Sequence, residues 1–137
     1  FNLATALNFD PIIFTPGASE IIAESKEQLS NLSKLLTEKP QVHLTLCGVT
    51  NKQDALTLFP ELKQQLEKSN REGEKSSVDI KLSTEQSSQL DQLAKARQDN
   101  SKNYLIDKHG IAHNRLIVCE PEYRKEDDAI AGVEINI

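Results

Sequence analysis

The residue most clearly suited to a chemical role in this 137-residue chain is Arg97, which lies in the longest predicted helix, over residues 83–110. A guanidinium removed from water costs several kcal/mol unless a carboxylate or a set of carbonyl groups compensates it. Arg97 is therefore either half of a packed ion pair with a loop carboxylate or the floor of an anion site. Helical spacing brings it onto one mostly apolar face with Leu90, Leu93, Ala94, Ser101, Tyr104 and Leu105.

Two cysteines, Cys47 and Cys119, could form a disulfide. Each ends a predicted strand, and we expect the two strands to lie in the same sheet. If the strands are parallel neighbours, the two sulfurs lie at similar height and can bond where the Cα atoms are within about 7 Å. The alternative is that both cysteines are small buried hydrophobic residues, because side chains on adjacent strands can point to opposite faces.

The sequence contains none of the common short motifs of catalysis: no GxSxG, HExxH, CxxC, P-loop or dinucleotide-binding glycine pattern. His109 and His113 are four residues apart, but Gly110 breaks the helix between them and no third ligand is near in sequence. We therefore expect no metal site and no cofactor. These observations favour a protein that is not an enzyme.

Charge and hydropathy narrow the class of partner. A net charge of −5, without a basic cluster interleaved with aromatic residues, argues against a nucleic-acid surface. We expect this domain not to span a membrane, because no run of about 18 apolar residues is present. Neither a signal peptide nor an initiating Met is found, which suggests a piece of a longer protein. The length and the 37% of hydrophobic residues fit one domain over residues 1–137.

Strands and helices alternate along the chain and must position Arg97. The first strand, helix and second strand have the lengths of a βαβ unit, which predicts two parallel strands with a right-handed crossover. Residues 49–54 are then a polar loop at the carboxyl end of a parallel strand, where α/β sheets place their sites. Pro60 either kinks the next helix or starts a second one. The predicted strands cover residues 8–15, 42–48, 114–119 and 132–137, with a short edge strand at 78–82, and the predicted helices cover residues 25–39, 55–66 and 83–110.

Two polar stretches are expected to be surface loops. Residues 68–82 form a mobile insertion with its short edge strand, and residues 120–128 carry seven charges and must be solvated. The sequence thus predicts an α/β fold, an α+β sandwich of order βαβαβ-β. Its mixed, mostly four-stranded sheet is covered by helices, and an enlarged segment separates the second strand from the helix of Arg97.

This order of elements resembles the OmpA-like domain of bacterial envelope proteins, which carries the motifs IxFxxGSAEL, GxTD, LSxxRA and VEIxI. The FTPGASEI opening, the enlarged segment and the element QDAL at residues 53–56 are similar to the carboxyl-terminal part of large AsmA-like envelope proteins of proteobacteria, a family mainly of unknown function. The resemblance covers roughly residues 8–137. Its matching stretches are IIFTPGASEI at residues 12–21, GVTN at 48–51, LAKARQ at 93–98 and VEINI at 133–137.

The resemblance implies a ligand site. In OmpA-like domains the GxTD aspartate and the LSxxRA arginine hold the diaminopimelate residue of the peptidoglycan stem peptide, and these positions are Asn51 and Arg97 here, with Thr50 as the motif threonine. Asparagine lacks the charge for an ammonium group, a loss on the order of 1–2 kcal/mol, and has the alternative role of capping a turn. Asp54 replaces the glycine of TDxxG and Ala94 replaces the LS serine. Asp54 either supplies the missing charge or pairs with Arg97 and closes the pocket.

The resemblance also implies a periplasmic location, within a larger protein anchored at the inner membrane. The first hypothesis is a non-enzymatic interaction domain with a degenerate peptidoglycan site, whose partner is another envelope protein. The alternative is a functional domain that binds the peptidoglycan stem peptide. An enzyme is the third class, and it would need a cleft with perturbed titrating groups.

Overall fold

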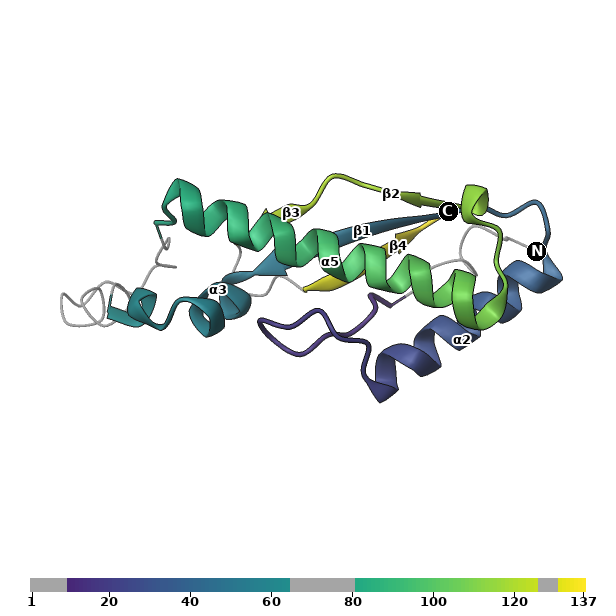
Figure 1. Ribbon diagram of the computed structural model, residues 1–137, viewed down its shortest axis with the longest axis horizontal. Helices are drawn as coiled ribbons and strands as arrows, with labels where there is room; N and C mark the ends of the chain where they lie inside the picture. The colour runs from purple at the N-terminus through teal and green to yellow at the C-terminus, as the bar shows by residue number, and fades with distance from the viewer. Residues whose placement is uncertain (1–9, 65–80, 126–130) are drawn as a thin grey trace.

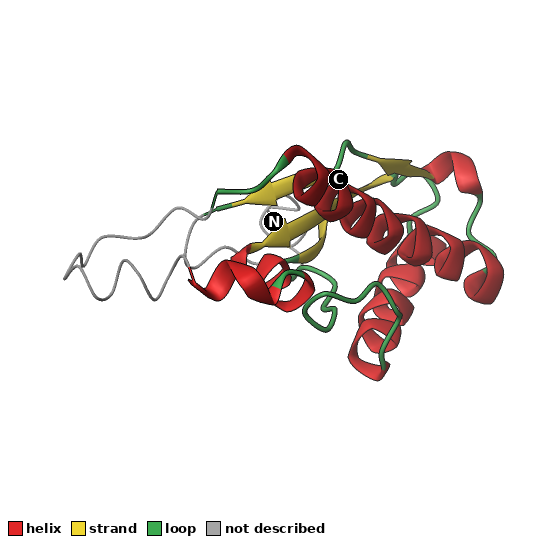
Figure 2. Cartoon of the chain, turned by 60° about the vertical axis from the view of Figure 1, so that its left-hand side comes forward, coloured by secondary structure: helices red, strands yellow, loops and turns green. Residues whose placement is uncertain are grey.

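A computed structural model describes residues 10–64, 81–125 and 131–137 of the chain. This part is a mixed α/β structure with three helices and a four-stranded mixed sheet. The long helix α5 lies across the sheet, and α2 packs beside α5 (Figure 1, Figure 2). The helices are α2 (Ala23–Glu38), α3 (Lys52–Leu58) and α5 (Thr84–His109), the short 3₁₀ turns are η1 (Pro60–Leu62) and η2 (His113–Arg115), and the strands are β1 (Leu44–Asn51), β2 (Leu116–Val118), β3 (Glu122–Arg124) and β4 (Gly132–Asn136).

Strand β1 is the centre of the sheet. The short strands β2 and β3 both run parallel to it, β2 beside Leu44–Leu46 and β3 beside Val49–Asn51. Strand β4 runs antiparallel to β1 and pairs with residues 45–49. Because β4 overlaps both short strands along β1, β2 and β3 must follow one another on the opposite edge of β1, as Figure 1 shows.

The predicted first strand, residues 8–15, is not formed in the described part of that range. Only Ile12 is paired, by a single antiparallel bridge to Val133 of β4. Side chains of α2 take the neighbouring main-chain groups instead: Gln28 accepts from the Ile13 N–H and donates to the Pro11 carbonyl, both at 2.9 Å, and the Ser25 hydroxyl donates to the Ile13 carbonyl. The chain at Ile12 and strand β1 are both antiparallel to β4, so they run parallel to each other as predicted, but β4 lies between them.

Helix α5 confirms the strongest sequence prediction. Ser83 caps its N-terminus by accepting from the Gln86 N–H at 3.1 Å, and the Gln86 side chain accepts from the Ser83 N–H at 3.0 Å. Gly110 ends the helix in the left-handed conformation, with φ 66°, where a residue without Cβ is favoured. The face of α5 that was predicted to point inward is the buried one, and Gln98 is buried as well. Leu93 and Tyr104 of the predicted face are only half-buried.

The core of the described part consists of two groups of apolar side chains under α5. The larger group includes Leu105 and joins α2, α5 and the strands, whereas the smaller one includes Leu90 and lies under α3 and η1. Arg97 lies about two helical turns from each of these leucines. The buried leucines of α2 are Leu29, Leu32 and Leu36, and Leu35 is half-buried.

Three other predictions near β1 and its edge need correction. The second strand does not end at Gly48 but continues to Asn51, so the predicted polar loop at residues 49–54 is strand and helix. Residues 114–119 contribute only the three residues of β2, an edge strand with Ile117 and Val118 exposed. The predicted solvated loop at residues 120–128 contains β3, whose charged side chains pair with each other and with β4.

The helix after β1 is shorter than predicted. It ends at Leu58, and Pro60 occupies the first turn of η1, one of the two roles expected for it. The predicted insertion at residues 68–82 and its edge strand lie outside the described residues up to residue 80, and Lys81 and Leu82 are not in a strand. The final strand, β4, is confirmed, with Val133 and Ile135 buried.

Candidate functional site

Arg97 is fully buried, and all five of its N–H donors are used. The guanidinium donates two hydrogen bonds to Asp54, at 2.6 and 2.9 Å. Three main-chain carbonyls accept the others: Ala18 from Nε at 2.8 Å, Val49 from Nη1 at 3.0 Å and Thr15 from Nη2 at 3.2 Å. A guanidinium carries five N–H groups, so none remains for a ligand.

Asp54 is saturated in the same way. It is 1% exposed, and each carboxylate oxygen accepts one bond from Arg97. Oδ1 also accepts from the Gly17 N–H at 2.7 Å, and Oδ2 from the Asn51 N–H at 3.1 Å. A carboxylate has about four acceptor positions, and four are filled. Charge-assisted, two-pronged pairing of this kind is the strong form of the arginine–carboxylate contact.

The junction of β1 and α3 places Asp54 beside Arg97. Val49 and Thr50 continue the strand, and Asn51 then caps α3, its Oδ1 accepting from the Asp54 N–H at 3.1 Å. Asn51 and Asp54 form a reciprocal capping box, which holds the carboxylate at the amino end of the helix. This confirms the capping role considered for Asn51.

The turn at residues 15–18 closes the other side of the guanidinium. Gly17 adopts φ 76°, and a Cβ there would come within 2.7 Å of Thr57 Cγ2. This conformation directs the Gly17 N–H to Asp54 while the carbonyls of Thr15 and Ala18 accept from Arg97. The Phe14 ring lies 5.5 Å from the guanidinium carbon, within the range of a cation–π contact. Arg97 of α5 thus joins two segments that are far from it and from each other in the sequence, residues 14–18 and residues 49–54.

The four residues predicted from the family motif are therefore brought together, but around an ion pair. The predicted pairing of Arg97 with a carboxylate is confirmed, and the carboxylate is Asp54. The Thr50 side chain is buried, and its hydroxyl finds no hydrogen-bond partner in the described part of the chain. An open hollow of about 850 Å³ lies along residues 84–96 of α5, with Ser19 and Leu58 on its other side, and none of the four residues lines it. Contact of these residues with a ligand stays a prediction.

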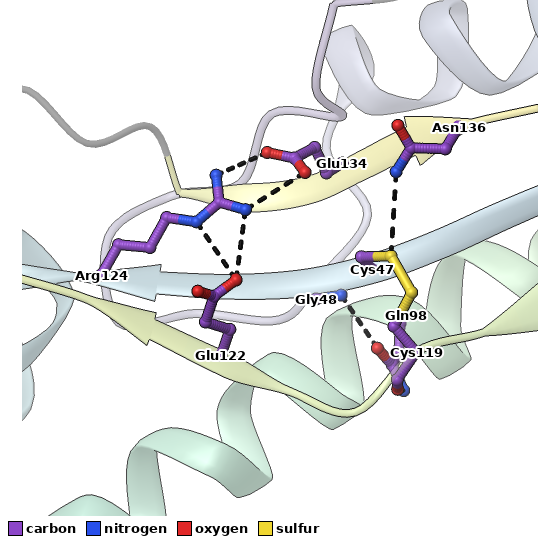
Figure 3. Close-up of a disulfide and its surroundings, with 8 residues drawn as sticks. All are labelled: Cys47, Gly48, Gln98, Cys119, Glu122, Arg124, Glu134 and Asn136. Carbon is purple, nitrogen blue, oxygen red and sulfur yellow. Dashed lines mark hydrogen bonds and ion pairs between the residues drawn. A yellow bond between two sulfur atoms is a disulfide. The ribbon is translucent and has the colours of Figure 1, made fainter.

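Cys47 and Cys119 form a disulfide across β1 and the end of β2, with Cα atoms 4.7 Å apart (Figure 3). The predicted geometry of neighbouring parallel strands is confirmed, and the alternative of two separate buried thiols is wrong. Both cysteines are half-buried. The Asn136 amide of β4 approaches the Cys47 sulfur at 3.9 Å.

Gln98, which the sequence analysis did not identify, joins the two strands at the same level. Its side chain accepts from the Gly48 N–H and donates to the Cys119 carbonyl, both at 2.8 Å (Figure 3). It thus takes the place of main-chain hydrogen bonds to β1 in the gap that follows β2 and precedes β3. Gly48 permits this contact, because a Cβ at that position would lie 2.0 Å from the Ala94 carbonyl oxygen of α5. The available signal was the spacing, since Gln98 follows Ala94 by one helical turn.

Three charged side chains on β3 and β4 form a second ion cluster that the sequence analysis missed. Arg124 contacts Glu134 at 2.5 and 3.1 Å and Glu122 at 3.2 Å (Figure 3). The hydrogen bonding that Arg124 donates to the Glu134 carboxylate lowers the pKa of Glu134 and raises the pKa of Arg124. The cluster is partly exposed to solvent, so it ties the strand ends together only moderately.

The described residues hold no group of three or more histidines, cysteines, aspartates or glutamates arranged to bind a metal ion. His109 instead packs edge-on against Tyr104, with ring centroids 5.6 Å apart. Across residues 10–64, 81–125 and 131–137, no helix has both the length and the apolar content required to cross a membrane. No protein-family model matches this chain, and no curated protein sequence matches it significantly.

Proposed function

We propose that this chain is a non-enzymatic interaction domain of a cell-envelope protein, with an OmpA-like fold whose peptidoglycan-peptide site is closed. The observation that carries the proposal is the saturation of Arg97, whose five donors are all taken by Asp54 and main-chain carbonyls. The domain then acts by contact with another envelope component.

The positions of the motif residues support the OmpA-like part of the proposal. The GVTN stretch ends the central strand, Arg97 lies midway along the helix that covers it, and VEINI forms the antiparallel strand β4. The stretches IIFTPGASEI, GVTN and LAKARQ meet at one place although they are up to about 80 residues apart, since Arg97 bonds to both Thr15 and Val49. The enlarged segment between α3 and α5 favours an AsmA-like parent protein.

Closure of the site follows from one replacement. Asp54 occupies the position at which the TDxxG motif has glycine, and its carboxylate fills the place in which a ligand carboxylate would meet Arg97. A stem peptide would have to displace this carboxylate and leave it buried without its partner. Stranding a buried charge in this way costs several kcal/mol, more than one new ion pair returns.

The disulfide supports the proposed location. Disulfides persist in oxidising compartments such as the bacterial periplasm and are rare in the cytosol. The Cys47–Cys119 bond closes a separation of 72 residues and so links the two halves of the described chain. We therefore place the domain in the periplasm, as part of an envelope-anchored protein whose anchor lies elsewhere.

Co-sedimentation with purified peptidoglycan sacculi tests the proposal. The wild-type domain should stay in the supernatant, whereas Asn51→Asp/Asp54→Gly, which restores the motif residues, should sediment in a saturable manner if it folds. Circular dichroism establishes whether the variant folds, and Asn51→Asp alone serves as the variant in which Asp54 still blocks Arg97. Saturable sedimentation of the wild type, lost in Arg97→Lys, would support the alternative, a functional peptidoglycan-peptide binding domain, and overturn the proposal.

A further inference from the structure

The edge formed by β2 and β3 is the most lightly packed part of the sheet. Of the six residues in the two strands, only Leu116 is buried, and Ile117 is 52% exposed. Each strand pairs with three residues of β1, whereas β4 pairs with five and contributes two buried apolar side chains. Segments with few buried contacts open at a lower free energy than the core does.

The edge is also interrupted at its middle. The Cys119 N–H still donates to the Leu46 carbonyl at 3.1 Å, but the chain then leaves β1 and pairs again only at Glu122. The Gln98 side chain spans this break from the helix side. At the break itself the Gln98 amide joins the edge to β1, and further along the partly exposed cluster of Arg124 joins β3 to β4.

The disulfide is the covalent bond that joins this edge, at Cys119, to β1, at Cys47. Figure 3 shows the bond at the break in the edge, with Gln98 approaching it from α5. Leu46 and Gly48 point toward the helix side, so Cys47 between them points to the opposite face of the sheet. Both cysteines are half-buried, which leaves the bond within reach of a small thiol.

We propose that the Cys47–Cys119 disulfide is a redox-sensitive lock that holds the β2–β3 edge on β1. A dithiol reductant supplies the two electrons: its thiolate attacks one protein sulfur, the other protein sulfur leaves as a thiolate, and the second thiol of the reductant resolves the mixed disulfide. The products are two cysteine thiols and the oxidised, cyclic reductant.

Reduction releases the edge while the rest of the domain stays folded. The main-chain pairing of β1 with β4, in which Cys47 lies opposite Glu134, does not depend on the bond between the two sulfurs, and neither do the packing of α5 and the bonds of Arg97. Opening of β2 and β3 exposes the main-chain groups of β1 along residues 44–51, an edge that an extended peptide can pair with. The oxidation state of the protein thus controls whether this edge is available.

Amide hydrogen exchange of the oxidised and the dithiothreitol-reduced protein tests the lock. The probes are the Cys119 N–H, which donates to the Leu46 carbonyl of β1 just before the break, and the Gly48 N–H, which donates to the Gln98 side chain at the break; the references are β4 amides in the same sample. On reduction, the exchange rate of the probes relative to the β4 amides should rise about tenfold or more. The ratio cancels the effect of any uniform loss of stability, because such a loss raises the exchange rates of the probes and of the β4 amides alike.

Thiol counting establishes that two thiols form, and Cys47→Ala/Cys119→Ala is the matched control, in which dithiothreitol should change nothing. An unchanged ratio after complete reduction would overturn the proposal, because the edge would then be held without the bond. Loss of the native circular dichroism of α5 on reduction would also overturn it, because the disulfide would then support the whole fold.

Discussion

Replacement of Arg97 by alanine is the perturbation that most sharply separates an ion pair from an open anion site. The change removes five hydrogen bonds at once. It leaves Asp54 buried without its charged partner, and it leaves three main-chain carbonyls, those of Thr15, Ala18 and Val49, without this donor. It also empties the volume of the largest fully buried side chain in the described part of the chain.

The expected cost in free energy of unfolding follows from these losses. Breaking a buried ion pair by removal of one partner costs about 3–5 kcal/mol, and a buried carbonyl left without a donor costs roughly 1–3 kcal/mol. Water that enters the vacated space offsets part of the second loss, so we expect about 4 kcal/mol or more. Because domains of this size are stable by about 5–15 kcal/mol, Arg97→Ala should be close to unfolding.

Urea unfolding followed by circular dichroism measures this cost as a change in midpoint at constant slope. A double-mutant cycle with Arg97→Met, Asp54→Leu and the double variant isolates the pair. The double variant should lose less stability than the sum of the single variants, because neither charge is then stranded. A loss below about 1 kcal/mol in Arg97→Ala would refute the reasoning, since a solvated anion site tolerates this removal.

Three further predictions concern other residues. Asn51→Asp should give no measurable affinity for a diaminopimelate-containing peptide in titration calorimetry, because Arg97 stays saturated; clear binding would mean that the pocket opens. Arg115→Ala should cost about 1–2 kcal/mol in a urea titration, because Arg115 donates to the carbonyls of Leu36, Lys39 and Val42 at the end of α2; an unchanged midpoint would show that water caps α2 equally well. The Glu134 pKa is lowered in the folded protein, so its contact with Arg124 stabilises above the unfolded pKa of about 4.5 and is lost as the pH falls through the lower folded value. The urea midpoints of wild type and Glu134→Gln should therefore differ at pH 6 and approach each other as the pH is lowered below about 4.5, and a difference that stays constant as the pH falls would contradict this.

The helix of Arg97 could be predicted because its signals are local. Ser83 and Gln86 cap its beginning, Gly110 ends it, and the spacing of apolar residues selects one face. The same spacing placed Arg97 inside, so a compensating group could be expected. The identity of that group could be narrowed to Asp54 but not decided, because the choice depends on where α3 begins.

The junction of β1 and α3 shows what was missed although a signal existed. Asn51 followed three residues later by Asp54 is a capping pattern, yet residues 49–54 were predicted as a loop because they are mostly polar. Thr50 is tolerated in the strand as a β-branched residue with its side chain buried. A capping pattern directly after a strand therefore outweighs polarity.

Other features depend on tertiary contacts that no local pattern contains. The three carbonyls that surround Arg97 are main-chain groups, which every residue type carries, so the sequence does not mark them. Gln98 bonds to main-chain groups of Gly48 and Cys119 only because β2 and β3 leave a gap beside it. The residues of strand β3 are predicted as a solvated loop because Glu122 and Arg124 are charged, but the strand pairs with β1, and Arg124 pairs with Glu134 of β4, which is distant in the predicted pattern.

Closure of the Arg97 site is the central claim, and the Nε–Hε resonance of Arg97 reports on it directly. This group donates to the Ala18 carbonyl at 2.8 Å, so in ¹H–¹⁵N spectra its signal should be protected from solvent exchange. During titration with a diaminopimelate-containing tripeptide to about 1 mM, which detects binding of roughly 4 kcal/mol, the signal should not move. A saturable shift of this resonance, together with the amide of Asp54, would contradict the claim and show that the site accepts the stem peptide.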